Sequence, residues 1–269
     1  MWCLDEETIT ILRISAVIMG LVFGSFLNVV IYRIPRHESI VFPPSHCPVC
    51  NDHIKWYDNI PVLSYIILRG RCRNCKARIS VRYPIIEALN GLLWLLNLNN
   101  SKDPLQCLFG FAFISLLIVI SAVDLDRMEI PDVFNCIIFG LAVVKLIIVL
   151  LLNRGSLYPL ADFGLGALSG SLLLFGLYYL LLKLTGKEGL GGGDVKLALA
   201  AGAFLGWKQV LFGIGVSAYI GLIVILISAA ITKKSLKKAF PFGPFLSGGF
   251  LISYLYFDSI FEWYINKFF

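Results

Sequence analysis

The sequence is short of charge. Only 15% of its 269 residues are charged, whereas 58% are hydrophobic, and a soluble globular domain usually carries about 25% charged residues. This shortage excludes an ordinary soluble domain and predicts a chain that lies in a lipid bilayer. A membrane-crossing helix needs on the order of 20 apolar residues, so the chain has room for several crossings and one modest domain outside the membrane.

The N-terminal end lacks the basic residues of a secretory signal peptide. Asp5, Glu6 and Glu7 precede the first apolar segment, and no small-residue cleavage site follows it. We therefore expect this segment to be retained as a membrane helix.

Hydropathy predicts an all-α polytopic membrane protein with about eight transmembrane helices. The second predicted span (84–98) and the sixth (196–207) are short. A tight helical hairpin near residues 197–215 that does not fully cross the membrane is the alternative to the sixth. The domains are then a first transmembrane helix (1–32), a small domain between helices 1 and 2 (33–83) and a transmembrane domain (84–269). The expected spans are residues 9–32, 84–98, 105–123, 132–152, 160–184, 196–207, 210–231 and 241–257.

Most basic residues fall in four segments, at 33–82, 124–131, 183–196 and 232–240. These segments share one side if eight spans alternate, and basic loops stay in the cytoplasm. The sequence therefore predicts that all four face the cytoplasm. One group is interpreted as a topology signal that also contacts lipid headgroups, which makes membrane lipids an expected partner: Lys233, Lys234, Lys237 and Lys238.

Four cysteines of the 33–83 segment form two C-x2-C pairs, Cys47 with Cys50 and Cys72 with Cys75. This spacing is typical of a structural zinc site, and four thiolates leave no open position for catalysis. Two disulfides or four free thiols are the alternative, and a reducing cytoplasm disfavours the disulfides. His37, His46 and His53 are alternative ligands, and Cys3, Cys107 and Cys136 are interpreted as small apolar residues.

Acidic residues gather where the third predicted span ends, in the segment SAVDLDRMEIPD. Acids at membrane depth are costly and are functional candidates by default. Asp124 is nearest to the apolar side, so it is the hardest to explain structurally. Asp132 follows Pro131 and suits a helix N-terminus, and Asp126 and Glu129 are interpreted as solvated loop charges.

A second acid follows a glycine run, in the segment GKEGLGGGDVKLALAAGAFLG. The run, with Gly189 and residues 191–193, lets the backbone approach another segment closely, and Asp194 opens a helix of small residues. A phosphate-binding loop is the alternative, although no nucleotide motif matches. Two carboxyl groups held together cannot both ionise easily, which suits them to activate water against a peptide bond. We therefore expect Asp194 and an acid of the first segment to form a catalytic pair, for which burial favours Asp124 over Asp126.

The chain resembles the type IV prepilin peptidases, which are membrane aspartyl proteases of the G-x-G-D class. The likeness extends over nearly the whole chain, in the right order. It rests on GLVFGSFLNVVIYRIPR (20–36), on CPVC and CRNC with WYDNIPVLSY between them, on RYPIIEALNG (82–91), on DLDRMEIPD (124–132) and on GLGGGDVKLALAAGAFLG (189–206).

The resemblance implies an enzyme of the bacterial inner membrane that removes the basic leader of type IV prepilins or pseudopilins, after a glycine and at the cytoplasmic face. It implies that Asp124 and Asp194 are catalytic, and that the product is N-methylated with S-adenosylmethionine. Gly70 and Arg71 stand where the family has a Gly-Lys pair linked with that transfer. Alternatives are a membrane protease without methyltransferase activity, and a zinc-bearing scaffold or transporter. We expect no nucleic-acid partner, and the oligomeric state is left open.

Overall fold

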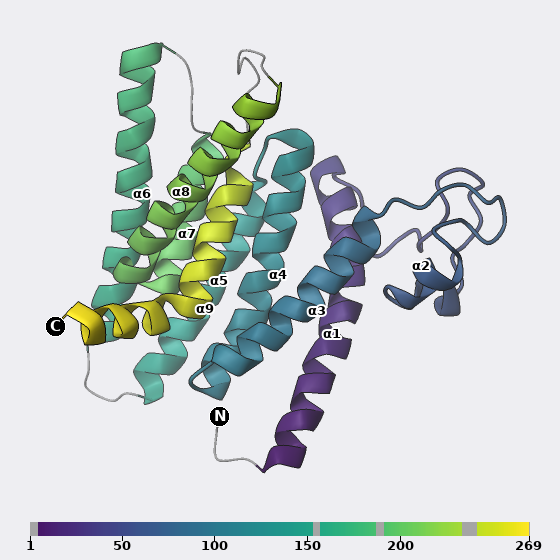
Figure 1. The fold of residues 1–269 in the computed structure, drawn as a ribbon, viewed down its shortest axis with the longest axis horizontal. Helices are drawn as coiled ribbons and strands as arrows, with labels where there is room; N and C mark the ends of the chain where they lie inside the picture. Colours follow the sequence, from purple (N-terminus) through teal and green to yellow (C-terminus); the bar gives the residue numbers. More distant parts are fainter. Residues whose placement is uncertain (1–4, 153–156, 187–190, 233–240, 269) are drawn as a thin grey trace. The chain divides into compact units, whose positions relative to one another are not determined.

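The computed structural model describes residues 5–152, 157–186, 191–232 and 241–268. Within these residues the fold is helical, which confirms the all-α prediction (Figure 1). The chain divides into two compact units, Met1–Val119 and Ile120–Phe269. The elements are α1 (Glu6–Arg33), η1 (Ile34–Arg36), η2 (Trp56–Asn59), α2 (Leu63–Ile67), α3 (Arg82–Asn100), α4 (Pro104–Arg127), α5 (Asp132–Leu152), α6 (Tyr158–Thr185), α7 (Gly192–Leu205), α8 (Trp207–Thr232) and α9 (Gly243–Phe268).

Five of the described helices are long and apolar enough to cross a membrane. They are α1 with η1, α4, α5, α6 and α8, so the chain is a multi-pass membrane protein. The helix α7 has 14 residues, which is about 21 Å of helix against about 30 Å of hydrocarbon. The helices α3 and α9 are not among the five that are long and apolar enough to cross a membrane. The count of eight spans therefore stays a prediction.

In the first unit, α1 packs lengthwise on α3. The helix α1 begins at its N-cap Asp5, whose carboxylate accepts the backbone N–H of Thr8. Small residues set the distance to α3, because a Cβ atom on Gly20 would lie 2.8 Å from the Cα of Gly91. The close packing is fixed by Asn90, which donates its side-chain amide to the carbonyl of Gly20 over 2.7 Å.

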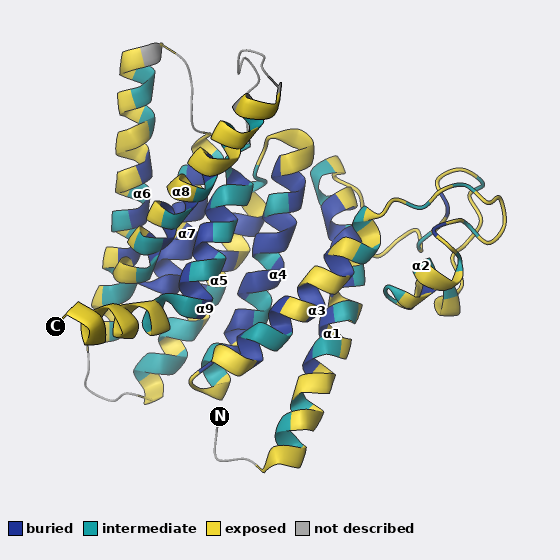
Figure 2. Cartoon of the chain, in the orientation of Figure 1, coloured by how far each residue is buried: buried dark blue, intermediate teal, exposed yellow. Residues whose placement is uncertain are grey.

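In the second unit, α7 is surrounded by α5, α6, α8 and α9. Figure 2 shows α7 as mostly buried, whereas α6 and α8 carry wide exposed faces. The exposed faces are apolar, with Leu172 and Leu226 among their residues, as helices in contact with lipid require. The helices α6 and α7 approach so closely that a Cβ atom on Gly166 would collide with the carbonyl of Gly202.

A single residue, Gly206, joins α7 to α8. Its φ of 86° lies in the left-handed region that favours glycine. Lys145 of α5, which hydropathy puts inside a span, stabilises the end of α7: its Nζ donates to the carbonyl of Phe204 over 3.1 Å. The last carbonyls of a helix have no partner within the helix and form the negative end of its dipole, so a cation there is favourable.

Candidate active site and metal centre

Asp124 lies in the last turn of α4, within the second unit. Its side chain is 5% exposed, and its Oδ2 accepts the backbone N–H of Gly243 over 2.9 Å. Gly243 is the first residue of α9, so the partially positive N-terminal end of that helix points at the carboxylate. A Cβ atom on Gly243 would lie 2.6 Å from Oδ2 of Asp124, so this approach requires glycine.

Asp194 is the third residue of α7 and is 6% exposed. Its Oδ2 accepts the backbone N–H of Gly191 over 3.0 Å, while its own N–H donates to the carbonyl of Gly191 over 3.1 Å. This reciprocal pair of hydrogen bonds fixes the first turn of the helix. Gly193 meets Ile130 of the loop between α4 and α5, and Gly189 of the predicted run lies outside the described residues.

The two carboxylates, 70 positions apart in sequence, both lie in the second unit, and the charge of Asp124 acts on Asp194. Each is buried, and each accepts a backbone N–H from a glycine at the start of a helix. Two neighbouring buried carboxylates favour a state in which one keeps a proton and the other is ionised. Such a pair can supply both a proton donor and a proton acceptor.

The other acids of the segment have different surroundings. Asp126 and Glu129 are exposed. Asp132 is the first residue of α5, as the sequence predicts, and both of its oxygens accept from Nζ of Lys196 over 2.8 Å. This ion pair joins the beginnings of α5 and α7, and it was not predicted.

Three buried polar atoms near the starts of α5 and α9 have no hydrogen-bond partner among the described residues. They are Nδ2 and Oδ1 of Asn135 on α5, and Oγ of Ser247 on α9. Neither residue was predicted, nor was Gly243. The Gly-Pro sequence at 243–244 signals a helix start, but nothing in the sequence links it to Asp124.

The four predicted cysteines of the first unit come together. Their Sγ atoms all lie within 4.8 Å of one another, and no disulfide joins any of the four, so the disulfide alternative is not what the structure contains. None of the described histidines belongs to the cluster. Cys107 packs in an apolar core with Ala16 and Leu98, as expected, whereas Cys136 is exposed on α5 and Cys3 lies outside the described residues.

The two C-x2-C pairs form matching turns. The N–H of Asn51 donates to the carbonyl of Cys47, and the N–H of Lys76 donates to that of Cys72. Asn51 and Lys76 both adopt a positive φ, at 55° and 61°. An isolated antiparallel bridge closes each turn, His46 with His53 and Arg71 with Arg78.

The first turn favours the thiolate of Cys47, whereas burial and the neighbouring thiols raise the pKa of Cys75 to about 11. Backbone N–H groups of Cys50 and Val49 lower the pKa of Cys47 to about 6, and a thiolate is the form that binds zinc. Four sulfur ligands at this spacing fit a tetrahedral Zn²⁺ site.

Two sets of polar contacts stabilise this small domain, one within it and one to α3. Arg73 grips Asp58 with three hydrogen bonds of 2.6 to 3.1 Å, which holds the pKa of the Asp58 carboxyl below its usual range. Glu87 of α3 accepts the backbone N–H of Val62 over 2.7 Å.

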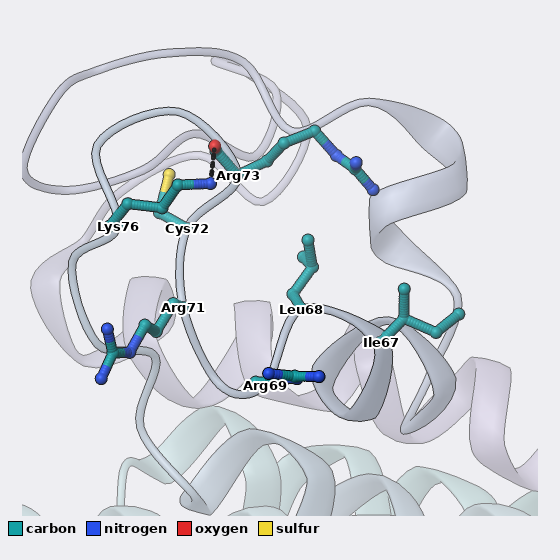
Figure 3. A pocket seen from close by; sticks show the side chains of 7 residues that line it. All are labelled: Ile67, Leu68, Arg69, Arg71, Cys72, Arg73 and Lys76. Atoms are coloured by element: carbon teal, nitrogen blue, oxygen red, sulfur yellow. Dashed lines mark hydrogen bonds between the residues drawn. The ribbon is translucent and has the colours of Figure 1, made fainter.

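A basic cavity of about 470 Å³ lies beside the cysteine cluster (Figure 3). Gly70 adopts a φ of 66°, and a Cβ atom there would lie 2.8 Å from the hydroxyl oxygen of Tyr65. Gly70 does not line the cavity itself, but its turn lies between the lining residues Arg69 and Arg71. The lining residues are Ile67, Leu68, Arg69, Arg71, Cys72, Arg73 and Lys76.

The fold and the two sites define a multi-pass helical membrane protein with a buried aspartate pair and a four-cysteine cluster. Residues 18–100 match the bacterial peptidase A24 N-terminal domain, and residues 111–231 match the type IV leader peptidase family. The chain belongs to the type IV leader peptidase family, the peptidase A24 family.

Curated relatives agree over almost the full length. A prepilin leader peptidase/N-methyltransferase of Aeromonas salmonicida is 34% identical over 93% of this chain and 92% of its own. One of Legionella pneumophila is 35% identical over 93% of both chains, and one of Klebsiella pneumoniae is 40% identical over 70% of this chain and 83% of its own. No solved structure matches the chain significantly.

Proposed function

We propose that this peptidase removes the leader of type IV prepilins or pseudopilins, with Asp124 and Asp194 as its catalytic pair. The observation that carries the proposal is the burial of two interacting carboxylates, each held by a glycine N–H, in a chain of the type IV leader peptidase family. The names of the relatives supply the substrate class.

The chemistry follows from the two protonation states of the pair. The ionised carboxylate takes a proton from water as the water oxygen attacks the scissile carbonyl carbon, and the protonated carboxyl donates to the carbonyl oxygen. The tetrahedral intermediate then collapses, the C–N bond breaks, and the leaving nitrogen receives a proton. The products are a leader with a free carboxylate and a pilin with a new amino terminus.

We place the cut at the cytoplasmic face of the bacterial inner membrane. The support is the distribution of basic residues, which favours one side for residues 33–82 and both aspartate segments. This orientation uses eight spans, with α3, α7 and α9 in addition to the five helices that meet the length and hydropathy criterion. The lysine cluster at 233–240, expected to contact lipid headgroups, lies outside the described residues.

The cysteine cluster is proposed to hold a structural Zn²⁺ with Cys47, Cys50, Cys72 and Cys75. The fit is supported by the closeness of the four sulfur atoms and by the matching turns around them. Residues 33–83 bury little apolar surface, so metal binding would contribute much of the free energy of folding of this domain.

Methyl transfer to the new amino terminus is the second proposed activity, because the relatives carry that name. The amine nitrogen would attack the sulfonium methyl of S-adenosylmethionine, the C–S bond would break, and the amine would lose a proton. Arg71, in the wall of the basic cavity, would hold the carboxylate of the donor through its guanidinium charge. Gly70 would shape the turn beside it.

Purified protein and a defined prepilin test the peptidase proposal. Asp124→Asn and Asp194→Asn should each abolish cleavage, while the exposed Asp126→Asn should cleave like the wild type. Activity retained in both variants would refute the assigned pair. Ion movement across the membrane that depends on this protein, without any cleavage of prepilin, would support a transporter instead.

The mass of the product's N-terminus tests methyl transfer separately. With saturating S-adenosylmethionine the wild type should add one methyl group, and Arg71→Ala should reduce methylation without reducing cleavage. An unmodified terminus from the wild type would leave a protease without methyltransferase activity.

A further inference from the structure

Asn135 is the exception among the buried asparagines of the described chain. Asn28, Asn90 and Asn97 each donate to a backbone carbonyl, at 3.3, 2.7 and 2.8 Å. The amide of Asn135 is as buried, with 5% of the residue exposed, yet its nitrogen and its oxygen both lack a partner. Buried polar groups are nearly always hydrogen-bonded, so each exception calls for an explanation.

Asn135 lies at the level of Asp194. The helices α5 and α7 run in the same direction, because they are tied near their starts by Asp132 with Lys196 and near their ends by Lys145 with Phe204. Asp194 is the third residue of α7, and Asn135 is the fourth residue of α5. Both side chains therefore belong to the first turn of adjacent parallel helices.

Ser247 has a matching relation to Asp124. It is 2% exposed and lies four residues after Gly243, which places it on the same face of α9, one turn further along. Gly243 is the residue whose N–H binds Asp124. The other buried serines of the second unit differ, since Ser217 and Ser253 donate to the carbonyls of Ile214 and Gln209 at 2.7 and 2.6 Å.

We propose that Asn135 and Ser247 bind the backbone of the substrate where it is unwound beside the aspartates. This inference rests on the proposed peptidase function. A helical substrate must unwind to expose its scissile carbonyl, and unwound peptide groups at membrane depth need new hydrogen-bond partners. The amide of Asn135 offers an NH2 donor group and a carbonyl acceptor, which complement a peptide C=O and N–H. Ser247 adds a hydroxyl that can donate or accept.

These atoms are covered in this structure, so substrate reaches them only by displacing the side chains that cover them. Binding then converts unpaired polar atoms of the protein into paired ones. The same exchange satisfies the peptide groups that unwinding releases. The interaction thus favours the unwound substrate over the helical one, and selection for a cleavable conformation is the expected result.

The first test compares stability with cleavage. Asn135→Leu keeps a similar volume and removes atoms that have no partner, so its melting temperature should equal or exceed that of the wild type. Its kcat/KM for a prepilin should fall roughly tenfold to a hundredfold, as expected for two lost substrate hydrogen bonds. Ser247→Ala should behave alike with a smaller loss.

Matched controls are Asn97→Leu and Ser253→Ala, which remove side chains with backbone partners. Both should melt at lower temperature, and their folded fraction should cleave at the wild-type rate. Wild-type cleavage by Asn135→Leu and Ser247→Ala would overturn this inference but not the proposed function. Losses of melting temperature as large as those of the controls would do the same. A wild-type chain that cleaves no prepilin would overturn the proposed function and this inference with it.

Ester substitution in the substrate gives a readout that a structural role would not change. Replacing single peptide N–H groups near the cut by ester oxygens should slow cleavage by the wild type at one position. The same ester should have little further effect on Asn135→Leu, because the bond is already lost. Equal penalties in both enzymes at every position would overturn the contact.

Discussion

The backbone N–H of Gly243 donates to Oδ2 of Asp124 over 2.9 Å, although 119 positions separate the two residues. The start of α9 thereby stabilises the carboxylate at the end of α4. The bond also orients the acid, because a charge-assisted hydrogen bond is short and directional. A residue that no motif contains thus becomes part of the candidate site.

Gly243→Ala should therefore damage the site directly. The new Cβ atom would lie 2.6 Å from Oδ2 of Asp124, so the carboxylate has to move and the bond weakens. Prepilin cleavage should fall by at least about tenfold, the range expected for a hydrogen bond to a charged group. The control is Gly248→Ala on the same helix, where a Cβ atom meets nothing within 4 Å. Equal cleavage by the two variants would contradict this role for Gly243.

The metal centre predicts about one zinc ion per chain in freshly purified, reduced protein. Cys72→Ser should lose most of the metal and make residues 33–83 more sensitive to protease, because metal binding stabilises this small domain. Elemental analysis and limited proteolysis measure both effects. Cys136→Ser, which changes an exposed cysteine outside the cluster, should keep the metal. Wild-type protein without zinc would show that the site assignment is wrong.

The ion pair between Asp132 and Lys196 should matter little. Its side chains are 64% and 58% exposed, and exposed ion pairs contribute about 0 to 1 kcal/mol. Asp132→Asn should therefore retain cleavage and lose at most a few degrees of melting temperature, with a smaller loss at high salt. Asp124 is buried, at 5% exposed, and Asp124→Asn should abolish cleavage. Comparing cleavage by the two variants therefore separates a structural acid from a candidate catalytic one.

Much of the fold follows from local signals. Apolar runs predict α4, α5, α6 and α8 closely, and the pair spacing of Cys47, Cys50, Cys72 and Cys75 predicts their cluster. In these cases the information lies within a helix length or in a short turn. The same holds for the prediction that Asp132 begins a helix, since Pro131 and the helix dipole act locally.

Long-range partners could not be predicted in this way. Nothing in the sequence near Asp124 indicates that Gly243 will approach it, and the unpaired state of Asn135 depends on what surrounds it after folding. The length of α7 was also unclear, because its Gly and Ala residues continue without a break into Gly206. Its end is set by the left-handed turn at Gly206 and by Lys145, which is distant in sequence.

Lys145 should stabilise the second unit. Its Nζ binds the carbonyl of Phe204 and lies 4.5 Å from the centre of the Phe204 ring. Lys145→Met keeps the aliphatic chain but leaves that carbonyl without this donor, so the free energy of unfolding should fall by about 1 to 3 kcal/mol. Thermal unfolding in detergent measures the change, with the exposed Lys208→Met as control. Since the carbonyl is at the far end of α7 from Asp194, kcat/KM of the folded protein should stay near the wild-type value. An unchanged melting temperature would mean that the end of α7 does not depend on this lysine.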